Sequence, residues 1–195
     1  MKYNNTLSSD SFKLLKSLHG EKVNKISITS AGLPNVQNES HHNMAFFILL
    51  QLDNKEIVIF SSLNMSKDGQ EFSEIRIVYP HQFPDENELF DEHEAIDTGL
   101  GYLWTPKSFL SGRVIRDNIN WTDGKNKFGM EIDIGIKLIF ENVELLVMAR
   151  DSSVGLLEVW IGESQEWTNN TEMYQDIYSF SSSEILCIYR EEILF

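Results

Sequence analysis

The segment Leu50-Gln-Leu-Asp-Asn-Lys-Glu-Ile-Val-Ile-Phe60 is repeated in outline 88 residues later as Leu138-Ile-Phe-Glu-Asn-Val-Glu-Leu-Leu-Val-Met148. In both segments two apolar runs flank a short polar turn that contains an acidic residue, an asparagine and a glutamate. Apolar, β-branched runs on either side of such a turn are typical of a β-hairpin. The chain is therefore predicted to contain the same kind of hairpin twice.

The residues before each hairpin predict a helix. Ser8, Ser9 and Asp10 are candidate N-caps of a helix in which Phe12, Leu15 and Leu18 lie on one face. Gly20 stands where a helix-ending glycine is favoured. The end of this segment reads Lys-Ser-Leu-His-Gly at residues 16–20. Residues 105–112 contain a Lys-Ser pair and a glycine in the same order, preceded by a threonine and a proline. Proline is favoured in the first turn of a helix, so this segment is predicted to be helical as well.

Each half of the chain is thus predicted to form one helix and four strands. The predicted fold class is α+β, predominantly antiparallel β, with two similar helix-plus-four-strand units that arose by internal duplication. The alternative is an ordinary α+β chain whose hairpins only look alike.

The predicted units form one compact body over residues 1–195. It comprises a first repeat unit at 7–82, an acidic connection at 83–104, a second unit at 105–162 and a C-terminal extension at 163–195. In the extension, residues 183–195 fit a helical stripe slightly better than a strand, and both readings stay open.

The composition indicates the size of the hydrophobic core and the cellular compartment of the protein. Its 195 residues, of which 42% are hydrophobic, are enough for a substantial core. No apolar run approaches the roughly 20 residues of a membrane span, and the N-terminal residues lack the apolar core of a signal peptide. The single cysteine, Cys187, cannot form an internal disulfide. These features predict a cytoplasmic protein.

The charge balance narrows the class of partner. The chain has 16 Lys and Arg against 30 Asp and Glu, a net charge of -14. Such a chain repels the phosphate backbone of nucleic acids and the surface of anionic membranes. It favours a basic protein as its partner.

The sequence contains no motif for a known chemistry. There is no nucleophile elbow and no phosphate-binding loop. Cys187 lies between two apolar residues, as a buried structural cysteine would. The neighbouring His41 and His42 would point to opposite faces of a strand, and Asp85–Asp91 lacks the central glycine of a calcium loop. We therefore predict no catalytic residue, no metal site and no cofactor, and folding that needs no metal.

Two stretches combine acidic and aromatic residues. Residues 77–106 and 151–189 contain no Lys or Arg. Carboxylates steer a basic partner and aromatic rings anchor it, whereas the alternative is a solvated acidic surface over ordinary core aromatics. The predicted partner-binding residues are Asp85, Glu86, Glu88, Phe90, Asp91, Glu92, Glu94, Asp97, Glu163, Glu166, Trp167, Glu172 and Asp176.

The leading hypothesis is a non-enzymatic, acidic protein-binding module. It would act as an immunity or inhibitor protein that neutralises a basic, nuclease-like toxin, without binding nucleic acid or membrane. Its small size, acidity and lack of motifs are similar in general terms to bacterial toxin-immunity proteins, although no motif carries that likeness. The alternatives are a carboxylate- or metal-dependent hydrolase with dispersed catalytic residues, and a structural subunit that forms a homodimer.

Overall fold

The computed structural model describes residues 2–30, 41–65, 71–84, 99–101, 105–149, 156–162 and 184–195. Within these ranges the chain is mostly β-structure, with a single α-helix, α1 (Ser9–Lys16), and one 3₁₀ turn, η1 (Pro80–Gln82). The strands are β1 Lys2–Asn5, β2 Lys22–Ser30, β3 His41–Leu52, β4 Glu56–Met65, β5 Glu71–Val78, β6 Gly99–Gly101, β7 Lys107–Asp123, β8 Asn126–Phe140, β9 Val143–Ala149, β10 Leu157–Ile161 and β11 Glu184–Leu194.

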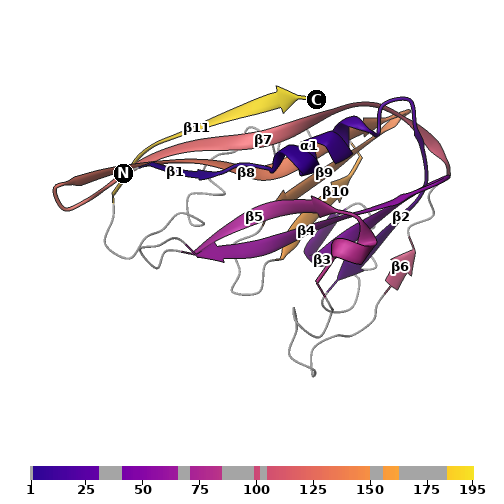
Figure 1. Ribbon diagram of the computed structural model, residues 1–195, viewed down its shortest axis with the longest axis horizontal. Coiled ribbons are helices and arrows are strands. Elements are labelled where there is room, and N and C mark those ends of the chain that lie inside the picture. Colours follow the sequence, from indigo (N-terminus) through magenta and orange to yellow (C-terminus); the bar gives the residue numbers. More distant parts are fainter. Residues whose placement is uncertain are drawn as a thin grey trace, which may run out of the picture.

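The strands belong to one hydrogen-bonded sheet, and six of them close into a ring. The ring runs β2–β3–β10–β9–β8–β7 and returns to β2 through two residue pairs, Lys22 with Ser108 and Val23 with Lys107. Outside the ring, β4 and β5 continue from β3, β6 pairs with β2, and β11 pairs with β7. β1 lies parallel to β8, whereas every other pair in the described chain is antiparallel, so the sheet is mixed. Figure 1 shows the β7–β8 hairpin projecting as a long arm beyond the rest of the sheet.

Helix α1 begins where the sequence predicts it. The Ser8 hydroxyl accepts a hydrogen bond from the Ser11 amide at 3.1 Å, which satisfies one of the free N–H groups of the first turn. Gly20 follows the helix with a φ of 78°, a conformation that glycine adopts without strain. The Ser11 hydroxyl donates to the Ile77 carbonyl oxygen at 3.0 Å, so the helix is fixed against β5.

Replacing the helix cap is expected to have a modest effect. Ser8→Ala removes the acceptor for the Ser11 amide and should lower the free energy of unfolding by about 1 kcal/mol. Urea unfolding of the two proteins measures the difference. Ser8→Asp restores an acceptor and should recover most of the loss, and equal stability of wild type and Ser8→Ala would show that the cap is energetically silent.

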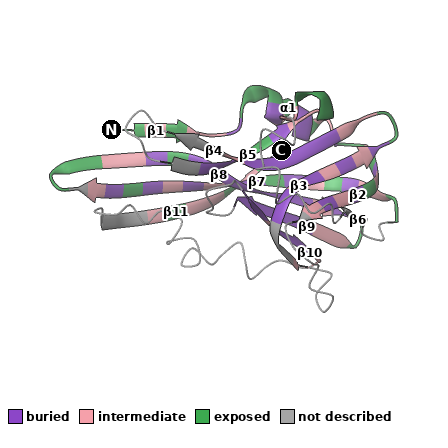
Figure 2. Cartoon of the chain, turned by 90° about the horizontal axis from the view of Figure 1, so that it is seen from below, coloured by how far each residue is buried: buried purple, intermediate pink, exposed green. Residues whose placement is uncertain are grey.

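The main core lies inside the ring of strands. Alternate residues of the ring strands meet there with apolar residues of β4 and β5. α1 adds Leu14 and Leu15, and the turn after it adds Leu18. A second apolar cluster lies on the other face of β7, β8, β9 and β10, around Trp121 and Met148. β8 is buried on both faces from Ile132 to Leu138, although Asp133 and Lys137 interrupt its apolar sequence. Figure 2 shows this buried inner part of β8 and the exposed tip of the β7–β8 hairpin.

Both predicted hairpins form. β3 and β4 pair antiparallel around a turn in which the Leu52 amide donates to the Lys55 carbonyl oxygen at 2.9 Å. β8 and β9 pair antiparallel around Glu141 and Asn142, and Asn142 has a φ of 63°. Asparagine tolerates this left-handed conformation better than most residues, which explains its place in the turn.

The predicted fold class is wrong. Residues 105–112 do not form a second helix, because β7 starts at Lys107 and pairs there with β2 of the first half. Residues 184–194 form strand β11 along β7 and not a helix. Strands of the first half also pair with strands of the second, β3 with β10 and β2 with β7, so the described chain forms one mixed sheet with one helix in place of two helix-plus-four-strand units. The division of the chain into the four residue ranges stays a prediction.

Candidate functional site

All thirteen predicted partner-binding residues lie outside the described residues, at positions 85–97 and 163–176. Their distribution along the chain can still be compared with the described framework. The described residues contain 14 Lys and Arg and 16 Asp and Glu, a net charge of -2. The remaining residues contain 2 and 14, a net charge of -12. The β-framework is therefore almost neutral, and eleven of those fourteen acids are predicted partner-binding residues.

Within the described chain, one face of the sheet changes from apolar to polar along the β7–β8 hairpin. Near the ring this face carries Val114 and Ile136, which belong to the main core. Farther out the same face carries Asn118, Asn120 and Glu131. Polar side chains of β1 continue this polar face beyond β8. The exposed Tyr189 of β11 continues it beyond β7.

A largely buried ion pair lies at the point where this face of the sheet changes from apolar to polar. Arg116 of β7 donates to Asp133 of β8 through Nε at 2.7 Å and through a terminal nitrogen at 3.1 Å. The Leu7 amide donates to the same carboxylate at 2.7 Å. The hydrogen bonding of the Arg116 side chain to Asp133 raises the pKa of Arg116, against the opposing effect of burial, and the negative charge of Glu131 adds to the rise. Arg116 therefore stays protonated and compensates the charge of the almost fully buried Asp133.

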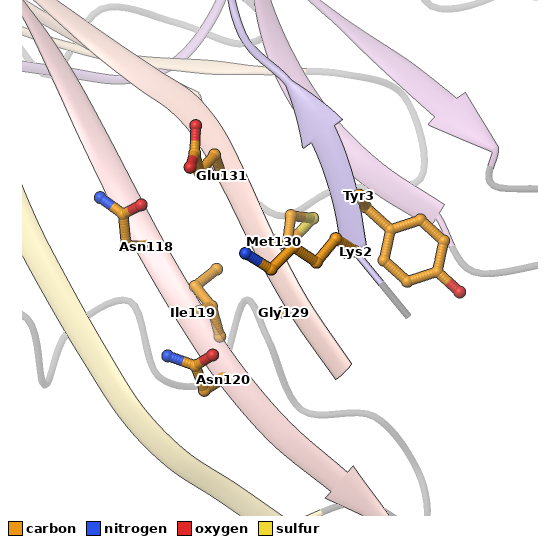
Figure 3. A pocket seen from close by; sticks show the side chains of 8 residues that line it. All are labelled: Lys2, Tyr3, Asn118, Ile119, Asn120, Gly129, Met130 and Glu131. Carbon is orange, nitrogen blue, oxygen red and sulfur yellow. The ribbon is translucent and has the colours of Figure 1, made fainter. Parts of the chain in front are cut away.

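Just beyond this pair, β1, β7 and β8 enclose a small polar hollow of about 120 Å³ (Figure 3). We call it the β1–β8 hollow. Gly129 lies at its floor, and four polar side chains surround it: Lys2 from β1, Asn118 and Asn120 from β7, and Glu131 from β8. Register places Asn120 and Lys2 on either side of Gly129, so the missing side chain of this glycine leaves the space open.

The amides of the hollow present oxygen atoms to it. The Nδ2 of Asn118 donates to the Glu191 carboxylate at 3.1 Å, so its Oδ1 remains available as an acceptor. The Oδ1 of Asn120 lies over the floor, 3.2 Å from the position that a Cβ on Gly129 would occupy. Glu131 makes no ion pair with any residue of the described ranges. Three acceptors, two amide oxygens and a carboxylate, therefore border one small space.

The opposite face of the same strands holds a second ion pair. Arg190 of β11 donates to both carboxylate oxygens of Asp117, each at 2.7 Å. The side chain of Asp117 is 0% exposed and that of Arg190 is 6% exposed. The pair is surrounded by apolar residues of the second cluster, such as Ile115, Ile119 and Ile188. It is a structural element that joins β11 to β7, and it is closed to a partner.

A larger groove of about 460 Å³ lies between α1 and β5. Its cations already have local partners, because Lys13 bonds to Asp10 at 2.9 Å and Arg76 pairs with Glu74. The groove therefore presents compensated charges on an exposed surface.

The described residues contain no group of three His, Cys, Asp or Glu side chains that could hold a metal ion. The His41 ring instead lies 3.0 Å from the Glu158 carboxylate and stacks on Trp160 with ring centres 4.9 Å apart.

The sequence prediction missed the residues of the β1–β8 hollow. A usable signal was present in Asn118-Ile-Asn-Trp121, where polar and apolar residues alternate. Asparagine is disfavoured in strands, so two asparagines on one face of a long strand indicate a reason other than strand formation.

Comparisons with known proteins do not identify a relative. No protein-family model, no curated protein and no solved structure matches the chain. No helix within the described ranges has the length and apolar character needed to cross a membrane.

Proposed function

We propose that the protein is a non-enzymatic, acidic binding module that masks a basic protein, such as a nuclease-like toxin. One observation carries the proposal: the net negative charge belongs almost wholly to the segments between the described strands, whereas the framework has a net charge of only -2. Acidic segments beside an almost neutral framework suit a protein that recognises a cationic surface.

The proposal assigns two physical roles to these segments. Their carboxylates attract the basic partner over distances of up to about 10 Å at 0.1 M salt, which raises the rate of encounter. Phe90 and Trp167 then anchor the complex, since aromatic side chains contribute much of the binding energy at protein interfaces. The proposal places this activity in the cytoplasm and includes no nucleic acid, membrane or cofactor.

Charge reversal tests the site. The triple variant Asp85→Lys, Glu86→Lys, Glu88→Lys should slow association with the partner by roughly 10-fold at low salt and much less at 1 M salt. If these charges are exposed, as the proposal requires, the free energy of unfolding should change by under about 1 kcal/mol per charge. Stopped-flow association and urea unfolding measure the two effects.

A matched control reverses three exposed acids of the described framework, Asp10, Asp53 and Glu141. Both triple variants change the net charge by the same amount, so the control separates the position of the charge from its total. An unchanged association rate in the first variant at low salt would refute the assigned surface. Equal slowing in both would show that only total charge matters.

The partner itself is found by affinity capture from the native host, with the open reading frames beside the gene identified. A basic protein whose association weakens with salt supports the proposal, whereas capture of a neutral or acidic partner contradicts it.

A further inference from the structure

We propose that the β1–β8 hollow accepts the guanidinium group of an arginine side chain from the basic partner. This inference rests on the proposed function for the source of the arginine. The hollow itself consists of described residues, and none of them belongs to the acidic segments on which the proposed function stands.

The size of the hollow limits its ligand. Its volume of about 120 Å³ is below the roughly 300–1,000 Å³ of sites that hold a whole metabolite. A space below this range suits the end of one side chain. A group carried by a larger molecule fits this limit better than a free metabolite.

The polar atoms around the hollow favour a ligand that donates hydrogen bonds and carries a positive charge. The Oδ1 atoms of Asn118 and Asn120 and the carboxylate of Glu131 are acceptors around the hollow. A guanidinium has five N–H donors in one plane and no acceptor, so it is complementary to such a set. Glu131 is also one of the carboxylates whose negative charge raises the pKa of Arg116, the neighbouring cation of β7.

Lys2 is the one residue of the hollow that opposes a cationic ligand. Figure 3 shows its side chain extending from β1 across β8 toward the hollow. It makes no ion pair with the described residues, and its side chain is exposed, so it can move aside when a ligand enters. Lys2 and Glu131 should consequently affect affinity in opposite directions, which a purely structural role of these residues would not produce.

The test uses a capped Gly-Arg-Gly peptide and its citrulline counterpart, in which a neutral urea replaces the guanidinium. Titration is followed by NMR through the side-chain amide signals of Asn118 and Asn120. We expect the arginine peptide to shift both signals with a dissociation constant on the order of 1 mM, and the citrulline peptide to shift neither. Absence of shifts, or equal shifts with both peptides, would overturn the proposal.

Variants separate the hollow from general electrostatics. Glu131→Gln should weaken arginine-peptide binding about 3- to 5-fold, and Lys2→Gln should strengthen it about 2- to 5-fold. Gly129→Ala should reduce binding without a change of charge, because its Cβ would lie 3.2 Å from the Asn120 oxygen. The matched controls Glu141→Gln and Lys16→Gln, at exposed sites elsewhere, should change affinity little. Equal effects of the controls and the hollow variants would contradict the assignment.

The outcomes also separate this inference from the proposed function. If the arginine peptide does not bind but the Asp85–Glu88 charge reversal slows the partner, the hollow is refuted and the binding module stands. If the peptide binds but no basic protein associates, the proposed function fails, and with it the arginine's assignment to a partner. If Glu131→Gln weakens both the peptide and the partner, both proposals are supported.

Discussion

Asp117→Ala is expected to lower the free energy of unfolding by about 3–5 kcal/mol, the largest effect that we predict for a single side chain. The carboxylate of Asp117 is 0% exposed and accepts two hydrogen bonds from Arg190. Its removal leaves a guanidinium that is 6% exposed among apolar side chains without its counter-charge. A buried charge without a partner is much less stable than either the ion pair or an apolar replacement of both residues.

Urea unfolding followed by circular dichroism measures this loss. The double variant Asp117→Leu, Arg190→Met is the control, since it removes both charges while keeping similar volume. It should recover most of the stability that the single variant loses. A cost of less than about 1 kcal/mol for Asp117→Ala, or a double variant as unstable as the single one, would contradict the assigned role.

Gly135→Ala is expected to cost about 1–3 kcal/mol, because β8 and β9 are too close for a side chain at this position. A Cβ on Gly135 would lie 2.2 Å from the Met148 sulfur and 2.9 Å from the Val147 carbonyl oxygen. The sulfur belongs to a flexible side chain, whereas the carbonyl oxygen is part of the strand backbone. Truncating Met148 should therefore not restore the stability of the Gly135→Ala variant.

Gly112 offers the matched comparison. A Cβ there would lie 2.1 Å from the Phe195 ring, and the three nearest atoms all belong to that side chain. Gly112→Ala should therefore be partly rescued by Phe195→Leu, so that the double variant loses less than the sum of the single losses. Thermal and urea unfolding of both pairs test the contrast. Rescue of Gly135→Ala by Met148→Ala would show that the Val147 backbone does not limit this site.

Sequence reasoning succeeded where the signal is local. Ser8 defines the start of α1 through its own backbone preference, and the structure confirms it as the N-cap. The predicted end at Gly20 is wrong by a few residues, because the helix ends at Lys16 with Ser17 as its C-cap and Gly20 lies in the turn that follows. The hairpins are also local, because Asn142 supplies the turn and the flanking apolar runs pair with each other.

Sequence reasoning failed where distant pairing decides the structure. Residues 105–112 carry helix signals, but Lys107 and Ser108 pair with β2, more than eighty residues earlier in the chain. Residues 184–194 fit either structure alone and become a strand through their pairing with β7. Such partners cannot be read from a window of a few residues, since tertiary pairing overrides weak local propensity. The β1–β8 hollow was missed for the same reason, because its four polar residues come from three strands.

The pairing of β1 with β8 has a consequence for the order in which the protein can assemble. Lys2 pairs with Gly129, and the ring closes only when β2 meets β7. During synthesis the first strands leave the ribosome well before their partners exist, so their backbone edges remain unpaired for that time. Sheets built from such distant pairs fold slowly, and their unpaired edges can associate with other chains. Folding of this protein should therefore depend on chaperones more than its modest size suggests.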